Sequence, residues 1–403
     1  RILIVGGAGL RAIAATLAEA GVIRHRLLFV AMTRWQGSHD GLKAGDAIAI
    51  CGSNSINYAV LFVGALRAGL TVAPLAPSSS PESLLGMLAD SASKLFFVDA
   101  SVNKAIAGVR DRLSMPLLTL DNSGSERHFN DWLAEEGAQP VAVEITPEMT
   151  FNVIYSSGTT GEPKGIVQSH GMRWSHIQRG LTMGYGPDCR TLMSTPLYSN
   201  TTLVSVLPTL FYGGTLVLMA KFDARRFLEM AERYRVTHAM LVPVQYQRIL
   251  ADPEFNRFDL SAFQLKLCTS APLRADVIRE AMERWPGNIR EVYGLTEGGI
   301  STSLDCAAHP DKWDSVGKPT EGAEVRVIDE EGNELPRGET GEIVGRAISM
   351  MRGYINREEQ TRDMLWTSPE GLVFYRSGDM GRVDEEGFVY ILDRRKDMII
   401  SGG

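Results

Sequence analysis

Short apolar runs alternate with amphipathic stretches along most of the chain. Buried strands are predicted at Ala47–Cys51, Thr71–Leu75 and Lys94–Asp99, with helices at residues 55–69 and 80–90. The alternation continues through further apolar runs at residues 191–196, 215–219, 238–242, 264–269 and 289–293. Strands that alternate with helices indicate a layered α/β fold whose strands are mostly parallel.

The pattern changes after residue 320. Alternating strands are predicted at residues 323–329, 340–346, 372–376 and 388–393, separated by turn sequences such as Asp384–Gly387. Such short alternating strands with tight turns are typical of antiparallel sheet. We therefore expect an α/β core with two sheet subdomains over residues 1–320 and a smaller antiparallel β-rich subdomain over residues 321–393.

A dinucleotide-like pattern lies near the start. Gly7–Ala12 fits G-x-G-x-x-A after an apolar run, and the helix that the fingerprint requires is predicted next. The fingerprint also needs an acid at the end of a second strand, where this chain has Thr33 and Arg34. An ordinary strand and helix is therefore favoured, and an NAD oxidoreductase is the minor alternative.

Composition narrows the classes of protein further. The 403 residues are 44% apolar and 22% charged, which is typical of a globular protein, and the net charge of −7 argues against a nucleic-acid partner. The four scattered cysteines form no Cys-x-x-Cys pair, which predicts no zinc site and a cytoplasmic location. No apolar run is long enough to span a membrane, and no signal peptide is recognisable.

The most informative stretch is Tyr155–Gly165, which packs four hydroxyl side chains of Ser and Thr with glycines and Lys164 after a predicted strand. Glycines let backbone N–H groups wrap around phosphate oxygens, and the hydroxyls and the ammonium add donors. The Walker A spacing is not met, because Lys164 follows Pro163 and precedes Gly165. The stretch predicts a phosphate loop of another type.

Tyr155–Gly165 resembles the phosphate-loop signature of the adenylate-forming superfamily, which includes acyl-CoA and aryl-CoA synthetases. Tyr293–Glu297 resembles its adenine and magnesium motif, Tyr375–Asp379 its ribose motif, and Asp393–Gly403 its hinge motif. Four motifs in the family's order over about 250 residues form a strong signal. The resemblance covers the chain from Gly41 to its end, although Asp393 stands where the family usually has Gly.

The resemblance implies a role for each matching residue. Tyr293 would stack on adenine, Asp379 would accept from both ribose hydroxyls, and Arg394 would contact ribose and phosphate. Glu297 would hold Mg²⁺, and Thr296 would donate to the α-phosphate or the bound carboxylate. The implied catalytic residues are Thr160, Lys164, Thr296 and Glu297. The implied ATP and AMP contacts are Ser156, Ser157, Gly158, Thr159, Thr160, Lys164, Tyr293, Gly294, Thr296, Asp379, Ile391 and Arg394.

The implied reaction needs cations more than acids and bases. A carboxylate that attacks the α-phosphate of ATP meets another anion, and two like charges 4 Å apart repel by about 4 kcal/mol at an effective dielectric of 20. Mg²⁺, Lys164 and Arg394 would offset that repulsion and stabilise the departing pyrophosphate. Positioning and charge would therefore carry the catalysis.

In the resembling CoA ligases, the segment that matches Pro196–Asn200 lines the acyl pocket. The implied pocket residues are Tyr198, Ser199, Thr201, Ser205, Ser270, Ala271 and Pro272. The small residues among them fit a roomy pocket and fit close helix packing equally well. The segment has no Asp to hold an α-amino group, which favours a simple aromatic or aliphatic acid.

The resemblance implies an acid–CoA ligase that uses ATP, Mg²⁺ and CoA. A carrier-protein-loading ligase is the alternative within the same chemistry, a non-catalytic nucleotide-binding module is one of another class, and a homodimer is left open. Residues 394–403 would form the hinge, about Lys396, and the start of a small C-terminal domain whose catalytic lysine has no counterpart here. We expect strongly weakened adenylation by the chain as it stands.

Overall fold

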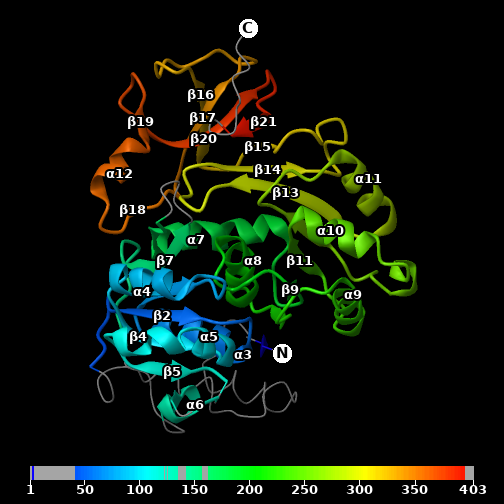
Figure 1. The fold of residues 1–403 in the computed structure, drawn as a ribbon. Helices are drawn as coiled ribbons and strands as arrows, with labels where there is room; N and C mark the ends of the chain where they lie inside the picture. The colour runs from blue at the N-terminus through cyan, green and yellow to red at the C-terminus, as the bar shows by residue number, and fades with distance from the viewer. Residues whose placement is uncertain are drawn as a thin grey trace. The chain divides into compact units, whose positions relative to one another are not determined.

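The computed structural model describes residues 2–3, 41–121, 123–124, 126–134, 142–156 and 162–394. The chain forms two compact units (Figure 1). The first comprises Arg1–Phe222 and Arg352–Asn356, and the second comprises Asp223–Met351 and Arg357–Gly403. The first unit is therefore completed by a short segment that follows most of the second unit in sequence.

The first unit contains an eight-stranded sheet that is parallel from β7 to β6 and ends in the antiparallel strands β8 and β18. Its strands, in spatial order, are β18 (Gly353–Tyr354), β8 (Lys164–Ser169), β7 (Thr150–Ser156), β3 (Thr71–Leu75), β2 (Ala47–Cys51), β4 (Ser93–Val98), β5 (Leu117–Thr119) and β6 (Arg127–His128). Every residue of β2 and β3 is buried, as expected for parallel strands covered on both faces.

Helices cover this sheet, and three of them begin at good capping residues. They are α3 (Ile56–Arg67), α4 (Pro81–Asp90), α5 (Ala100–Ala105), the 3₁₀ turn η1 (Ala107–Arg112) and α6 (Phe129–Trp132). Ser55, Ser80 and Asp99 each accept a backbone N–H at a helix start. The helix α3 packs on β2 and β3, and α4 and α5 pack on β4. Sequence-local capping therefore sets where α3, α4 and α5 begin.

A second layer of the first unit holds strands β9 (Arg190–Met193), β10 (Thr215–Leu218) and β1 (Ile2–Leu3). The strand β10 runs parallel to β9 and antiparallel to β1. The helices here are α7 (His170–Arg179), the 3₁₀ turn η2 (Gly180–Met183) and α8 (Asn200–Phe211), and α7 packs along α8.

The second unit begins with three parallel strands, β11 (His238–Leu241), β12 (Leu265–Cys268) and β13 (Asn288–Gly294). The antiparallel strands β14 (Ser301–Asp305) and β15 (Lys318–Pro319) extend them. The covering helices are α9 (Ala224–Arg233), α10 (Pro243–Leu250), the 3₁₀ turn η3 (Phe255–Arg257) and α11 (Ala275–Arg284). The ring of the buried Trp285 contacts Phe227, Tyr246 and Phe263, which anchors these helices to one another.

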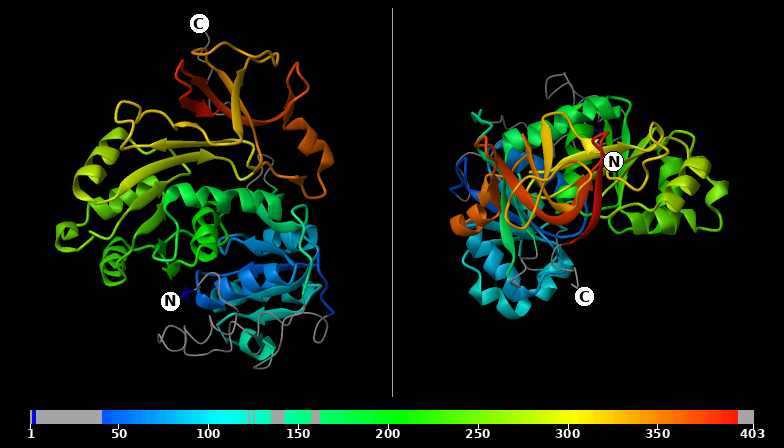
Figure 2. Two further views of the ribbon diagram at one scale, coloured as in Figure 1. Left: turned by 180° about the vertical axis from the view of Figure 1, so that it is seen from behind. Right: turned by 90° about the horizontal axis from the view of Figure 1, so that it is seen from above.

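The second unit also contains an antiparallel sheet that curls on itself, drawn in orange to red in Figure 2. Its strands are β16 (Ala323–Ile328), β17 (Gly341–Ala347), β20 (Val373–Val383), β19 (Leu365–Thr367) and β21 (Val389–Arg394), and α12 (Glu358–Asp363) precedes β19. Register shifts interrupt the pairing of β17 with β20 and of β20 with β21. Such bulges bend strands and increase twist, which accounts for the curl.

The predicted fold class is confirmed: layered α/β sheets with mostly parallel strands, and a smaller antiparallel β-rich part. The dinucleotide-like Gly7–Ala12 lies outside the described residues. Among the residues that the structure describes, no helix is both long and apolar enough to cross a bilayer.

Candidate active site

The hairpin of β7 and β8 carries the hydroxyl-rich loop. Ser156 pairs with Lys164 at the base of the loop, and Tyr155 pairs with Gly165. The structure thus brings two predicted phosphate-binding residues side by side, and the Lys164 ammonium lies 5.4 Å from the centre of the Tyr354 ring. The other predicted loop residues, Ser157, Gly158, Thr159 and Thr160, lie outside the described residues.

Gly165 is required by close packing beside Lys164. A Cβ at this position would lie 2.6 Å from the Ile355 Cγ2 atom and 2.8 Å from the Val153 Cγ1 atom. The Ile355 backbone N–H also donates to the Gly165 carbonyl. The segment that completes the first unit therefore presses directly on the root of the loop, and glycine lets it do so.

Two residues from different predicted motifs meet in the second unit. The Tyr293 hydroxyl at the end of β13 donates a 2.6 Å hydrogen bond to the Asp379 Oδ2 atom on β20. Asp379 is only 4% exposed, and the Tyr293 ring packs against a buried cluster that includes Ile300 and Ile343. The predicted adenine-stacking and ribose-binding residues are thus neighbours in space.

Asp379 is held by its own strand and the next one. Its backbone N–H donates to the Ser377 hydroxyl, which in turn donates to the Ile343 carbonyl. The Glu342 carboxylate, 5% exposed, accepts from the Arg376 guanidinium and from the Gly378 N–H. The turn that presents Asp379 is therefore fixed by bonds between the Tyr375–Asp379 motif and residues Glu342 and Ile343 of β17.

Thr296 and Glu297 follow β13 in a half-buried turn. The Glu297 carbonyl accepts from the Met351 N–H at 2.6 Å. Gly299 lets this segment approach β20, because a Cβ there would lie 2.3 Å from the Tyr375 Cβ atom. The structure therefore packs the Thr296–Glu297 turn onto the ribose motif within the second unit.

A magnesium site of the expected kind needs few protein ligands. No cluster of three or more His, Cys, Asp or Glu side chains suited to a metal occurs in the described part of the chain. Mg²⁺ commonly takes one or two carboxylates and fills its other positions with substrate phosphates and water. A single carboxylate at Glu297 fits that donor set.

The last predicted nucleotide contacts lie on β21. Ile391 pairs with Gly381 and packs on the same buried cluster as Tyr293. The Arg394 backbone pairs with Asp379, which places the end of β21 beside the ribose motif. The predicted hinge residue Lys396 lies outside the described residues.

The predicted acyl segment of the first unit is fixed by Asn54, a residue that sequence reasoning missed. The Asn54 amide donates to the Thr195 and Met219 carbonyls at 2.9 and 3.1 Å, and its oxygen accepts from the Leu197 N–H at 2.7 Å. Tyr198 next to it is half-buried, and burial, with a smaller effect of the Cys51 thiol, raises the pKa of its phenol. The backbone of this segment is therefore held by a buried amide.

The predicted pocket residues of α8 differ in exposure. Ser199 caps the helix without a side-chain cap hydrogen bond, and Ser199 and Thr201 are half-buried. Ser205 is fully buried, and its hydroxyl accepts from Tyr185, itself 4% exposed. Of these three positions, Ser205 therefore lies deepest and is already engaged with another side chain.

Ser270, Ala271 and Pro272 form an exposed loop of the second unit. Ser270 has φ of +76°, which is unusual for a residue with a side chain. Leu273 anchors the end of the loop: it is buried, and its N–H donates to the buried Glu291 carboxyl at 3.0 Å. The sequence signal for Glu291 was an acid two residues from Ile289 and from Tyr293, on the same face of the strand predicted at residues 289–293.

A second missed cluster surrounds the fully buried Arg173 of α7. Its guanidinium donates to the side-chain oxygens of Asn152 on β7, Gln168 on β8 and Asn200 at the start of α8. No acid pairs with Arg173 among the described residues, and burial lowers its pKa to about 9. This cluster ties the phosphate-loop hairpin to the first turn of the acyl segment.

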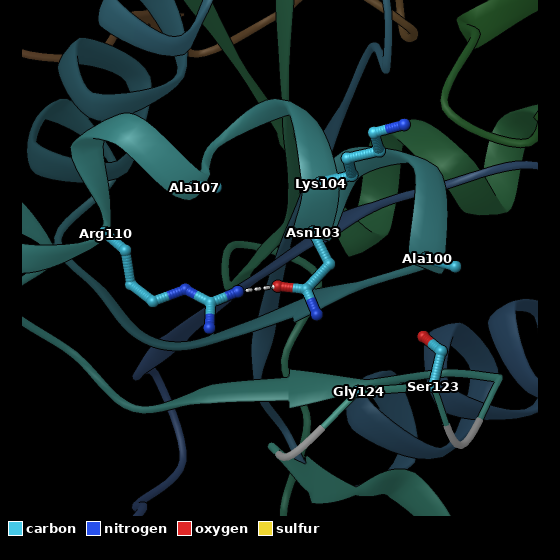
Figure 3. A pocket seen from close by; sticks show the side chains of 7 residues that line it. All are labelled: Ala100, Asn103, Lys104, Ala107, Arg110, Ser123 and Gly124. Carbon is cyan, nitrogen blue, oxygen red and sulfur yellow. Dashed lines mark hydrogen bonds between the residues drawn. The ribbon is translucent and has the colours of Figure 1, made fainter.

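A cavity of about 390 Å³ lies elsewhere in the first unit (Figure 3). It is lined by Ala100, Asn103, Lys104, Ala107, Arg110, Ser123 and Gly124. The Arg110 guanidinium is already paired with Glu126 and with the Asn103 side chain. The cavity contains none of the predicted site residues, and its guanidinium is neutralised.

Comparison with known proteins identifies the family of the chain. The family model described as AMP-binding enzyme matches residues 38–355. Feruloyl-CoA synthase of Amycolatopsis sp is 33% identical over 368 residues, covering 90% of this chain and 71% of that protein. The long-chain-fatty-acid–CoA ligase FadD13 of Mycobacterium tuberculosis is 31% identical over 367 residues, with coverage of 90% and 71%.

The structural comparison gives the same result. The crystal structure of ATP-bound MatB from Rhodopseudomonas palustris matches with a TM-score of 0.78 and 30% identity, covering 90% of this chain and 71% of that one. These similarities confirm the predicted enzyme class, an AMP-forming acid–thiol ligase. The chain belongs to the AMP-binding enzyme family.

Proposed function

We propose that the enzyme activates an aromatic or aliphatic monocarboxylic acid with ATP and transfers the acyl group to the thiol of coenzyme A. In the first step an acid oxygen attacks the α-phosphorus, and the bond from that phosphorus to pyrophosphate breaks. In the second step the CoA thiol loses its proton to water, its sulfur attacks the acyl carbon, the acyl–phosphate bond breaks, and AMP leaves. The attacking acid is already ionised at neutral pH, so the first step requires no general base.

The observation that carries this proposal is the hydrogen bond from Tyr293 to Asp379. A carboxylate offers about four lone-pair sites, so Asp379 can accept from ribose while it accepts from Tyr293. Fixing the phenol by its hydroxyl orients the ring, whose flat face suits adenine. Ile391, on the same buried cluster, would contact the nucleotide beside it.

The remaining roles follow from charge. We propose that the phosphates are held by Ser156, Lys164 and the hydroxyls of Thr159 and Thr160. Glu297 would help to hold Mg²⁺, and Thr296 would orient the α-phosphate or the acid. Arg394 would contact ribose and phosphate, and Lys396 would serve as the hinge. These groups act on charge that develops on phosphate oxygens, where preorganised donors are most effective.

The acid class rests on the acyl segment and the relatives. Tyr198, Ser199 and Thr201 supply no carboxylate for an α-amino group, and relatives include a feruloyl-CoA synthase and a long-chain-fatty-acid–CoA ligase. We propose a cytoplasmic enzyme without a nucleic-acid partner. Four buried free cysteines in the described part support that location. That the enzyme forms a homodimer is a prediction, which a measurement of its molecular mass in solution would test.

Acid-dependent exchange of labelled pyrophosphate into ATP by the full-length enzyme tests the proposal. Hydroxycinnamic, benzoic, medium-chain and long-chain acids form the panel, and added CoA should convert the adenylate into a thioester and AMP. Asp379→Ala should lose exchange, whereas Glu283→Ala, which changes an exposed acid on α11, should keep it. Transfer to a phosphopantetheinyl carrier but not to CoA would favour the carrier-loading alternative, and nucleotide binding without exchange would favour a non-catalytic module.

A further inference from the structure

Glu291 is a buried acid that the proposed chemistry does not use. It lies on β13, is 3% exposed, and is flanked by Cys268 on β12 and Leu304 on β14. One carboxyl oxygen, Oε1, accepts from the Leu273 N–H at 3.0 Å, and the other, Oε2, is buried without a hydrogen-bond partner in the described structure. A buried polar group with one unsatisfied atom is costly, so its retention calls for a physical reason.

The backbone that Glu291 holds is strained. Ser270 adopts the left-handed region with φ of +76°, and the exposed residues between it and Leu273 make the turn into α11. Left-handed conformations at non-glycine residues persist only where surrounding contacts fix them. The Leu273 N–H bond to Glu291 is such a contact, and it lies where the loop re-enters the core.

Glu291 also shares a strand with the nucleotide residue Tyr293. Residues two apart on a strand point to the same face. The side chain that holds the loop and the side chain that reaches Asp379 therefore project from one face of β13, within one unit. A shift of the loop at Leu273 would be transmitted to the strand end that presents Tyr293.

We propose that Glu291 is a positioning residue for the nucleotide site, and that its carboxyl fixes the Ser270–Leu273 loop against the strand that carries Tyr293. This inference rests on the proposed function for its consequence in catalysis. Its structural part, the attachment of the loop, stands independently. Glu291 touches neither nucleotide nor acid in this scheme and acts through Leu273.

The groups that face Glu291 favour the uncharged form. They are the Cys268 and Cys306 thiols and the Tyr246 phenol, and the buried residues of α11, such as Ile278, carry no charge. Lys266 on β12 instead directs its ammonium to the carbonyls of residues 285–287. Arg290, next in sequence, pairs with Asp305. Burial without a facing cation raises the pKa of Glu291 to about 8.

This shift has a defined sign for stability. An unfolded glutamic acid loses its proton above its ordinary pKa of 4.5, whereas the folded one keeps it until about 8. Between these values the folded state binds more protons, so the free energy of unfolding falls as pH rises and levels off above the folded pKa. A Glu291→Gln variant, neutral at every pH, should lack this decline.

The experiment compares the wild-type chain with Glu291→Gln, Glu291→Ala and the control Glu283→Gln, which changes an exposed acid on α11. Amide hydrogen exchange at Leu273 reports the attachment directly. We expect exchange at least tenfold faster in Glu291→Ala, and protection like that of wild type in Glu291→Gln and Glu283→Gln at pH 7. Unchanged protection of Leu273 in Glu291→Ala would overturn the proposal.

AMP affinity measured from pH 6 to 9.5 tests the link to the nucleotide site. Wild type and Glu283→Gln should lose affinity above pH 8, Glu291→Gln should stay level, and Glu291→Ala should bind several-fold more weakly throughout. A loss of AMP affinity above pH 8 that persists in Glu291→Gln would refute the link between Glu291 and the nucleotide site. If Glu291→Ala does not fold, the Glu291→Gln profile decides the question. Absence of AMP binding by wild type would refute the proposed function, while Leu273 exchange and the pH dependence of unfolding would still test the attachment.

Discussion

The hydroxyl of Tyr293 and the carboxylate of Asp379, 86 residues apart in the chain, are joined by a 2.6 Å hydrogen bond. Each residue was singled out from a different sequence motif. Their contact means that a change in either should disturb the orientation of the other, which makes the pair suited to a double-mutant cycle.

Asp379→Asn should weaken AMP binding by about 10-fold or more, because a hydrogen bond to a charged group contributes about 1.5–3 kcal/mol. Tyr293→Phe keeps the ring and loses only the hydroxyl, so its effect should be smaller, whereas Tyr293→Ala should lose stacking as well. Calorimetric titration with AMP measures each variant and the double variant Tyr293→Phe/Asp379→Asn. Additive effects of the two substitutions would argue against coupling between these side chains.

Gly165→Ala should displace Lys164 and weaken ATP binding, since the added Cβ would lie 2.6 Å from Ile355 and 2.8 Å from Val153. We expect destabilisation of about 1–3 kcal/mol from the overpacking. Gly86→Ala on α4 is the matched control, because its Cβ meets nothing within 4 Å and alanine favours a helix by about 1 kcal/mol over glycine. Urea denaturation and ATP titration of both variants make the comparison. If Gly165→Ala and Gly86→Ala had the same stability and the same ATP affinity, close packing at Gly165 would not explain the requirement for glycine there.

Ser377→Ala should loosen the turn that presents Asp379, because Ser377 both accepts from the Asp379 N–H and donates to the Ile343 carbonyl. Loss of these bonds should raise the Kd for AMP several-fold, with a loss of stability of about 1–2 kcal/mol. Ser368 follows β19 of the same sheet, and its hydroxyl accepts from the Leu372 N–H and bonds to the Glu370 carboxylate, neither of which belongs to the motif. Ser368→Ala should therefore leave AMP affinity at the wild-type value. An equal loss of AMP affinity in Ser368→Ala would show that the effect of Ser377→Ala comes from general destabilisation of the sheet.

Arg173→Met should destabilise the first unit even though it removes a buried charge. The substitution removes the guanidinium donor from the side-chain oxygens of Asn152, Gln168 and Asn200, although Asn200 keeps a 3.3 Å bond from the Gln168 amide. A buried acceptor left unsatisfied costs about 1–3 kcal/mol. We expect a net loss of about 3 kcal/mol, measured by urea denaturation. Arg112→Met removes an exposed arginine with a 3.9 Å contact to Glu82, and it should change stability by less than about 0.5 kcal/mol. If Arg173→Met were more stable than wild type, the cost of burying the charge would exceed the contribution of the hydrogen bonds that Arg173 makes.

The sequence predicted the parallel strands well. Ala47–Cys51 and Thr71–Leu75 agree residue for residue, because fully buried strands appear as short apolar runs bounded by turn residues. Tyr293 and Asp379 were identified because their motifs have a recognisable order. These features are local, so a linear pattern contains them.

Pairings between distant segments were missed. The two-residue strand β18 exists only because Gly353 and Tyr354 pair with β8, and nothing in their local sequence signals a strand. The strand predicted at residues 372–376 in fact runs from Val373 to Val383, because a glycine with φ of +71° at Gly378 is accommodated by an irregularity in pairing. Glu291 and Arg173 were missed because their roles depend on partners brought by other elements.

The placement of residues 352–356 within the first unit has a consequence for synthesis of the protein. A chain emerging from the ribosome presents β8 long before Gly353 and Tyr354 are made, so one edge of the first sheet stays uncapped during that interval. A nascent chain halted within the second unit would expose that edge for pairing with another molecule. The root of the phosphate loop, pressed by Ile355, would reach its final packing only once the second unit has largely been translated.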